Sequence, residues 1–228
     1  MSKLILLRHL KSQWNEENRF SGWVDIPLSK EGKKQAKEIC FKILKYKIDR
    51  IYTSLLFRNM DTVSRILEIS PKYPLFIHID KGKMEKWGNY IDIDKKYIEV
   101  YVTEKLNERY YGKLQGLNKE ETIEKYGEKK VLLWRRSYKI APPQGESLED
   151  VYNRVIPFYK KYIEKDLKNG KNILLVSSHN TLRAILKYIE KINDEDIINF
   201  EIPFGGIIEY GFSKDFQLEN KKIYAIIK

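Results

Sequence analysis

Short apolar runs alternate with longer segments of helical periodicity along this chain, and that alternation restricts the fold more than any other feature of the sequence. Residues 3–7 and 48–52 have the length and composition of buried strands, and a third such run begins at 172. Segments 30–44 and 147–162 repeat apolar residues at the spacing of a helix that covers a core. Strands that alternate with helices pack into a largely parallel sheet. We therefore predict an α/β fold, a three-layer sandwich in which helices flank a mostly parallel central sheet.

Polar residues mark where three of the helices begin. Ser29 and Ser147 each stand where a side chain can cap a helix, and Asp150 completes the capping-box spacing after Ser147. Asn118 and Glu121 have the same capping-box spacing. Pro157, inside the last long helical segment, predicts a kink or a bend that faces solvent.

The 228 residues are enough for one domain, and no low-complexity segment marks a linker. We therefore predict a single domain over residues 1–228. The middle segment, from about 70 to 105, is the hardest to assign. Residues 75–79 and 97–106 have strand-like composition, and the turn-rich stretch 86–96 lies between them.

The net charge of +11 has several interpretations. Nucleic acid, an anionic membrane or a small anionic substrate could each account for it, and so could a lysine-rich solvated surface. No apolar segment reaches the length of a membrane span, and the aromatic residues do not interleave with basic ones as in a nucleic-acid-binding module. Cys40 is the only cysteine, which excludes an intrachain disulfide and fits a reducing compartment. We expect a soluble cytoplasmic protein that binds neither membrane nor nucleic acid.

Two of the three histidines follow strand-like runs directly. LILL leads into Arg8 and His9, and ILLVSS leads into His179, where a helical pattern begins. Ligands of open α/β sheets bind at the carboxyl ends of the strands, and a buried cation requires an anionic partner. The pattern favours an anion pocket over the plainer alternative of solvated strand ends. The third histidine, His78, lies inside a short strand-like run, where a structural role is more usual.

The residues of this pocket favour phosphoryl groups as ligands. Arg8 and Arg58 can each donate paired hydrogen bonds to phosphoryl oxygens, and the start of the helix after His179 favours negative charge. No cysteine pair, HExxH, aspartate cluster or glycine-rich phosphate loop indicates a metal site. Phosphoryl transfer without a metal needs a protein nucleophile, for which neutral imidazole is suited. It also needs an acid that protonates the leaving oxygen.

One family resembles this chain from near its first residue to its last strands, the middle segment excepted. The cofactor-dependent phosphoglycerate mutases of the histidine phosphatase superfamily are similar to it in LLRHLKSQWNEENRFSGWVDIPLSKEG, YTSLLFRNMDT, LNERYYGKLQGLNKEETIEKYG, WRRSYKIAPPQGESL and SSHNTLRA. Many phosphatases share the Arg-His element, whereas NERYYGKLQGLNK followed by WRRSY resembles the mutase substrate pocket. The resemblance implies a histidine-phosphatase-like fold and an isomerase of glycolysis and gluconeogenesis. Such an enzyme interconverts 3-phosphoglycerate and 2-phosphoglycerate through a phosphohistidine.

Carried over residue by residue, the resemblance implies a division of roles. His9 would be the nucleophile that becomes phosphohistidine, and Glu108 would be the general acid and base. Arg8, Arg58 and His179 would bind the transferring phosphoryl group and stabilise its developing charge.

The resemblance also implies how the rest of the substrate is held. The expected substrate contacts are Asn15, Ser21, Gly22, Tyr111, Lys119, Arg135, Arg136 and Asn180. 2,3-Bisphosphoglycerate would prime the enzyme, and no metal would be needed. The partners would be small phosphorylated three-carbon acids, and the expected homo-oligomer is a dimer.

The chain departs from the usual pattern of this family at several places. Leu10 stands where the family usually has glycine, and Lys11 adds positive charge where it often has glutamate or glutamine. The His179-Asn180 element is one residue shorter, the segment at about 70–105 is enlarged, and the chain stops soon after its last strand. These departures leave two alternatives open. One is a histidine phosphatase that hydrolyses small phosphate esters, and the other is a catalytically weak protein that binds phosphate ligands.

Overall fold

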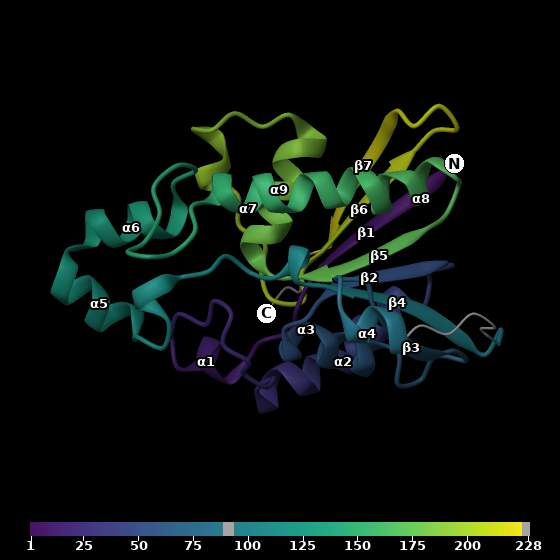
Figure 1. Cartoon of the computed structure of the whole chain (residues 1–228), viewed down its shortest axis with the longest axis horizontal. Helices are drawn as coiled ribbons and strands as arrows, with labels where there is room; N and C mark the ends of the chain where they lie inside the picture. Colours follow the sequence, from purple (N-terminus) through teal and green to yellow (C-terminus); the bar gives the residue numbers. More distant parts are fainter. Residues whose placement is uncertain (89–93, 225–228) are drawn as a thin grey trace.

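A sheet of seven strands runs through the middle of the molecule (Figure 1), whose computed structural model describes residues 1–88 and 94–224. The strands are β1 (Ser2–Arg8), β2 (Arg50–Ser54), β3 (Tyr73–His78), β4 (Tyr97–Thr103), β5 (Ile173–Ser177), β6 (Ile207–Phe212) and β7 (Leu218–Tyr224). Their order in the sheet is β3-β4-β2-β5-β1-β6-β7, and β6 is antiparallel to both of its neighbours, β1 and β7, whereas the other pairs are parallel. The prediction of a mostly parallel central sheet is confirmed.

Helices cover both faces of this sheet, as predicted for a three-layer α/β fold. The α-helices are α1 (Gln13–Glu16), α2 (Lys30–Ile43), α3 (Phe57–Ile66), α4 (Lys83–Trp87), α5 (Lys119–Tyr126), α6 (Glu128–Arg136), α7 (Leu148–Phe158), α8 (Lys165–Lys168) and α9 (His179–Glu190). Shorter 3-10 turns span Glu104–Leu106, Gly112–Leu114 and Asp196–Asn199. Helices α2 and α3 pack on one face, and α7 and α9 pack on the other (Figure 1).

Strand β1 shows why the central strands consist of unbroken apolar runs. Leu4 and Leu6 pack in the core under α7 and α9, whereas Ile5 and Leu7 pack in the core under α2 and α3. Successive side chains of a strand point to opposite faces, so a strand covered on both faces needs apolar residues throughout. Burial of each such side chain stabilises the fold by about 2 kcal/mol. The sheet is therefore a well-packed base for the residues that follow its strands.

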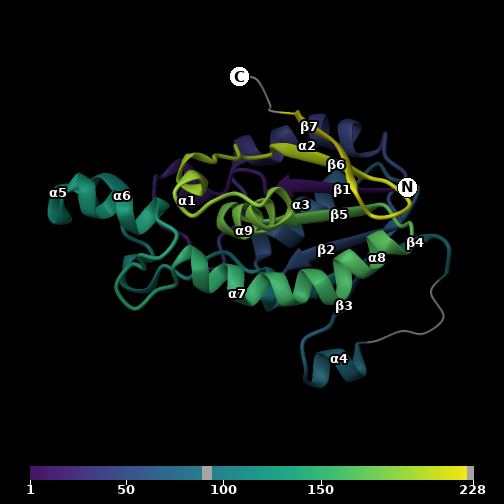
Figure 2. The same ribbon diagram turned by 90° about the horizontal axis from the view of Figure 1, so that it is seen from above.

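Helices α5 and α6 project from the rest of the molecule, beyond the carboxyl ends of the parallel strands (Figures 1 and 2). A small separate core of Phe20, Leu114, Val131 and Trp134 supports them. Gly127 separates the two helices with a φ of +83°, a conformation that residues with a Cβ rarely adopt. The projection belongs to the segment between β4 and α7.

The predicted helix starts are confirmed. The Ser29 hydroxyl accepts a hydrogen bond from the N–H of Gly32, and Ser147 forms a capping box with Asp150. The Asn118 side chain accepts from two N–H groups in the first turn of α5. Pro157 faces solvent, and the helix continues past it into a π-helical turn at Tyr159–Glu164. A proline cannot donate to the carbonyl four residues back, and the wider turn follows directly after this break in the pattern.

Strand β2 begins two residues later than the predicted 48–52. Thr53 and Ser54 belong to it because both are fully buried between β4 and β5. Two strands occur in the middle segment, as predicted, and the short helix α4 between them was not predicted (Figure 2). The turn-rich stretch 86–96 lies partly outside the described residues.

Candidate active site

One cavity gathers all the residues for which the sequence predicted a role. It is lined by Arg8, His9, Asn15, Arg19, Phe20, Ser21, Gly22, Arg58, Glu108, Tyr111, Lys119, Arg135, Arg136, His179, Asn180, Glu201 and Phe204. Four adjacent parallel strands lead to it: His9 follows β1, Arg58 lies in α3 after β2, and His179 begins α9 after β5. Glu108 comes from the segment after β4. The cavity therefore lies where open α/β sheets bind their ligands.

His9 has the tautomer and the neutral charge that nucleophilic attack by a histidine requires. Its Nδ1 lies 2.7 Å from the backbone oxygen of Leu10, which can only accept, so Nδ1 carries the proton. Nε2 keeps its lone pair. Burial, and then the positive charges of Arg58 and Arg8, lower the pKa of His9 well below its ordinary value of 6.5. The imidazole is therefore neutral at neutral pH.

The cations around His9 are fixed by backbone oxygens. Arg58 is fully buried and donates to the carbonyl oxygens of Gly22 at 2.8 Å and Val24 at 3.1 Å. Arg8 donates to the carbonyl oxygen of Ile202. Burial lowers the pKa of Arg8 to about 10, which leaves it charged at neutral pH. Both guanidinium groups are thus held in place before any ligand arrives.

Several buried polar atoms of these cavity residues have no hydrogen-bond partner within the described part of the chain. They are Arg8 Nε, Arg58 Nε, Ser21 Oγ and His179 Nε2. A buried donor without a partner costs about 1–3 kcal/mol. An anion with several oxygens, such as a phosphoryl group, would accept hydrogen bonds from donors of this kind.

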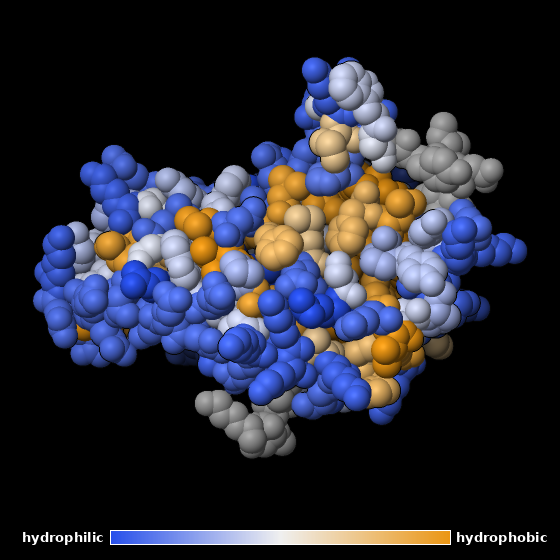
Figure 3. Space-filling model, turned by 90° about the horizontal axis from the view of Figure 1, so that it is seen from below, coloured by the Kyte–Doolittle hydropathy of each residue, from blue (hydrophilic) through white to orange (hydrophobic). Residues whose placement is uncertain are grey.

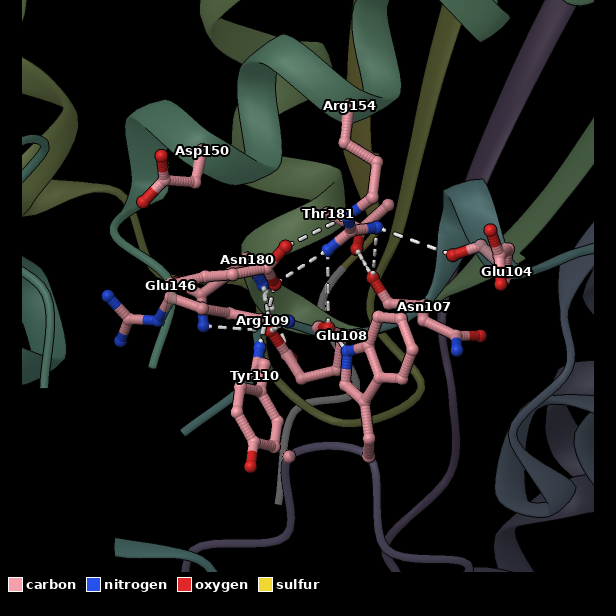
Figure 4. Close-up of polar contacts among 12 residues, drawn as sticks. Glu104, Asn107, Glu108, Arg109, Tyr110, Glu146, Asp150, Arg154, Asn180 and Thr181 are labelled. Carbon is pink, nitrogen blue, oxygen red and sulfur yellow. Dashed lines mark hydrogen bonds and ion pairs between the residues drawn. The ribbon is translucent and has the colours of Figure 1, made fainter. Parts of the chain in front are cut away.

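Glu108 is nearly buried, at 7% exposure, and its carboxylate is held by surrounding donors (Figure 4). Glu108 Oε1 accepts from the N–H of Arg109 at 2.6 Å and from Asn180 Nδ2 at 2.9 Å. The same Asn180 nitrogen lies 3.3 Å from the hydroxyl of Tyr111. Asn180, a predicted substrate contact, therefore binds Glu108, the predicted acid, directly. Tyr111, another predicted substrate contact, lies against Asn180.

An ion pair that the sequence did not indicate fixes the backbone around Glu108 (Figure 4). Arg154 of α7 pairs with Glu146 through hydrogen bonds of 3.1 and 2.9 Å. The same guanidinium donates to the backbone oxygens of Lys105 at 2.9 Å and Asn107 at 3.1 Å. Arg154 thus joins a helix to the segment that presents Glu108.

The end of α6, which carries Arg135 and Arg136, is held by two fully buried arginines. Arg109 Nη2 donates to the backbone oxygen of Arg135 at 2.9 Å, and Arg183 Nη2 donates to that of Arg136 at 3.1 Å. These two residues were also missed. The sequence could have indicated a role for Arg183, because a cation on the apolar face of a helix needs hydrogen-bond acceptors.

Lys119 adds a third cation from the projecting helices. It begins α5, and its Nζ donates to Asn18 Oδ1 at 3.2 Å. Burial, and then the positive charge of Arg135, lower the pKa of Lys119 to about 8. Lys119, Arg135 and Arg136 come from the projection, whereas the cations around His9 come from the body of the molecule (Figure 1).

The segment between β1 and α2 supplies the remaining predicted contacts. Gly22 has a φ of +52°, which strains any residue with a Cβ, and a Cβ there would lie 2.2 Å from Gln115 Oε1 and push that side chain aside. The carbonyl oxygen of Gly22 accepts a hydrogen bond from Arg58. Asn15 lines the cavity, and its Oδ1 accepts from the hydroxyl of Ser12 at 2.7 Å. Ser21 is nearly buried beside them.

The departures from the family pattern do not disturb the cavity. The Leu10 side chain is fully buried in the core under α2 and α3, and so leaves the cavity open. Lys11 lies 2.8 Å from Glu31 and does not line the cavity. His179 and Asn180 both line it.

The side chains of the cavity are suited to anions. Among the described residues, no group of three or more His, Cys, Asp or Glu side chains could hold a metal ion. Within residues 1–88 and 94–224, no helix is long and apolar enough to cross a membrane. Arginine, lysine and histidine predominate in the cavity instead.

Comparison with known families gives a match over most of the chain. The model of the histidine phosphatase superfamily (branch 1) matches residues 4–96 and 89–220. The 2,3-bisphosphoglycerate-dependent phosphoglycerate mutase of Methanococcus vannielii is 47% identical over 94% of this chain and 92% of its own length. The enzyme of the same name from Chlamydia pneumoniae is 43% identical over 98% of this chain and 96% of its own length.

Solved structures with the same fold include phosphatases. A mycobacterial glucosyl-3-phosphoglycerate phosphatase complexed with VO3 superposes with a TM-score of 0.74 at 20% identity, over 98% of each chain. Bacillus stearothermophilus YhfR gives a TM-score of 0.75 at 18% identity, over 96% of this chain and 95% of its own. At such identities the likeness confirms the histidine-phosphatase-like fold alone.

Proposed function

The chain belongs to the histidine phosphatase superfamily, and we propose that it interconverts 3-phosphoglycerate and 2-phosphoglycerate through a phosphohistidine on His9. Its similarity to phosphoglycerate mutases over nearly the full chain supports this isomerase activity. One observation carries the proposal: the cavity contains two sets of cations, one around His9 and one on α5 and α6. A phosphatase needs only the first set, whereas a mutase must also retain a bisphosphate while it reorients.

The proposed chemistry follows from the atoms around His9. His9 Nε2 attacks one phosphorus of the bisphosphate, so that an N–P bond forms while the P–O bond to the glycerate oxygen breaks and a monophosphoglycerate is left. Glu108 gives its proton to the leaving oxygen. Arg8 and Arg58 stabilise the charge on the transferring group, together with His179. In the other half-reaction the phosphoryl group moves from His9 to the free hydroxyl of 3-phosphoglycerate, whose proton returns to Glu108. The bisphosphate that forms reorients, its other phosphoryl group returns to His9, and 2-phosphoglycerate leaves.

The residues of the cavity fit 2,3-bisphosphoglycerate as the primer. The unpartnered donors of Arg8, Arg58 and Ser21 suit one phosphoryl group, and the cations of α5 and α6 suit the other phosphate and the carboxylate. When bound, 2,3-bisphosphoglycerate supplies the phosphoryl group that charges His9. We propose Asn15, Gly22, Tyr111 and Asn180 as further substrate contacts in the same cavity.

The combined change Arg135→Ala with Arg136→Ala tests whether the second set of cations makes the enzyme a mutase. We expect mutase activity to fall by about a hundredfold or more, since loss of a charged anchor commonly costs a few kcal/mol. Hydrolysis of a small phosphate ester should fall much less, because the groups around His9 remain. A coupled assay for 2-phosphoglycerate and an assay for free phosphate give the two rates.

The matched control is Lys129→Ala with Lys130→Ala, which removes the same charge from exposed positions of α6 outside the cavity. This control should leave both rates near those of the unchanged protein. A proportional fall of both rates in the arginine variant would contradict the proposed role. Free phosphate as the main product of the unchanged enzyme would favour the phosphatase alternative.

Three further predictions accompany this function: a single domain over residues 1–228, a cytoplasmic location and a homodimer. We propose that the dimer forms at the free edge of β3. The N–H groups of Tyr73 and Ile79 donate toward β4, so those of Phe76 and His78 point to the open edge. Pro74 has no N–H, and prolines in sheets are confined mainly to such edges. A two-fold pairing centred on Phe76 would place Pro74 opposite His78 and lose little hydrogen bonding.

The surface around β3 also exposes apolar side chains. Tyr73 is 65% exposed, Leu75 and Phe76 are half-buried, and Figure 3 shows an apolar area beside the projecting α4 segment. The other edge, β7, exposes Lys221 and Lys222, and lysines on an edge oppose pairing. Light scattering should give a molar mass about twice the 27.3 kDa of one chain. A monomer mass at micromolar concentration would refute the dimer.

A further inference from the structure

Glu201 places a carboxylate among the cations of the active-site cavity. It belongs to the segment between the 3-10 turn at Asp196–Asn199 and β6, and neither its position nor its neighbours in the sequence indicated a role. Glu201 Oε1 lies 3.5 Å from Arg8 Nη1 and 3.4 Å from His179 Nε2. Glu201 Oε2 forms an ion pair with Arg136. One carboxylate therefore bridges the two sets of cations, through Arg8 and Arg136.

The groups that Glu201 contacts are those to which we assign the substrate's anionic groups. Arg8 belongs to the cations around His9, and Arg136 belongs to the set on α6. His179 lies beside Arg8 in the same cavity, and burial, and then the charge of Arg8, lower its pKa well below 6.5. A carboxylate uses the same donors as a phosphoryl oxygen or a substrate carboxylate. Two anions in one place repel each other, so Glu201 and a bound phosphate compete for these donors.

The side chain of Glu201 is free to leave this position while its backbone stays fixed. The side chain is 51% exposed, so water can replace the contacts that it gives up. The backbone is tied on either side of it: the N–H of Phe200 donates to the carbonyl oxygen of Ile197 at 3.2 Å, and Arg8 donates to the carbonyl oxygen of Ile202. Displacement therefore needs only rotation of one side chain.

We propose that Glu201 is an internal counter-ion that occupies the anion position of the cavity and is displaced by substrate. This inference deepens the proposed function, on which its account of the substrate rests. A ligand that binds there must replace the three contacts of Glu201 with contacts of its own anionic groups. Ligands with several anionic groups, such as a phosphorylated acid or a bisphosphate, can replace contacts in both sets of cations. A single small anion replaces fewer, so Glu201 raises the selectivity for polyanions.

Glu201→Gln tests this proposal because it removes the charge and keeps the size of the side chain. Titration calorimetry with inorganic phosphate should show binding about fivefold tighter than in the unchanged protein, since an exposed ion pair contributes about 1 kcal/mol to the competition. The gain for 3-phosphoglycerate should be smaller than for phosphate. The preference for 3-phosphoglycerate over phosphate should therefore decrease.

The matched control is Glu195→Gln, an equal change of charge at an exposed residue nearby that does not line the cavity. It should leave both affinities unchanged. Equal or weaker phosphate binding in Glu201→Gln would overturn the proposal, because a counter-ion that competes must give tighter binding when removed. Thermal unfolding checks that both variants fold. Phosphate binding requires no turnover, so this test stands apart from the mutase assay, and either proposal can fail alone.

Discussion

His9→Ala should abolish both isomerisation and hydrolysis while the protein stays folded. We expect the rate to fall by at least about a thousandfold, because the imidazole is the proposed covalent carrier and nothing else in the cavity can replace it. His179 is the nearest chemical substitute, but it is fixed at the start of α9 by a different strand. After incubation with radiolabelled 2,3-bisphosphoglycerate, acid-labile phosphate should appear on the unchanged protein and be missing from the variant.

His78→Ala is the matched control for this experiment. His78 ends β3 and does not line the cavity, so its loss should leave labelling and turnover intact. Labelling of the unchanged protein should also persist as the pH falls from 8 to 6.5. The pKa of His9 lies well below 6.5, so the imidazole remains neutral over that range and charges only at lower pH. Stoichiometric acid-labile phosphate on the His9→Ala protein would disprove the mechanism.

The sequence predicted a mostly parallel sheet and two histidines at the ends of its strands because both depend on local patterns. A strand covered on both faces requires continuous apolar residues, and His9 and His179 stand directly where two such runs end. The sheet then places those ends side by side, since β1 and β5 pair in parallel. The resemblance to a family added Glu108, which no local pattern distinguished from the other glutamates.

The sequence did not predict the contacts that hold these residues in place. Arg154 reaches Glu146 and backbone oxygens far away in the chain, and Arg183 reaches the end of α6. Such contacts depend on how helices cross and on where segments return, which residue spacing does not specify. The sequence did not indicate Glu201 for the same reason, because only the folded chain brings it to Arg8.

Glu108→Gln should slow the isomerisation of 3-phosphoglycerate by about a hundredfold or more, the usual effect of losing a general acid. Glutamine keeps an oxygen that can accept from the N–H of Arg109 and the side chain of Asn180, so the local geometry should survive. What is lost is the proton for the leaving oxygen. Coupled assays give the rate, and calorimetry should show a much smaller change in substrate affinity.

A substrate whose leaving group needs no proton separates acid catalysis from a structural role of Glu108. Phosphorylation of His9 by 4-nitrophenyl phosphate should slow far less in Glu108→Gln than phosphorylation by 2,3-bisphosphoglycerate, because nitrophenolate departs as an anion. Glu104→Gln is the matched control, since Glu104 lies in the preceding 3-10 turn and does not line the cavity. If both donors slowed equally in Glu108→Gln, Glu108 would act on the position or charge of His9 and its cations. The proton would then have to come from another group in the cavity, and the protonated form of Lys119, with its pKa lowered to about 8, would be the first to test.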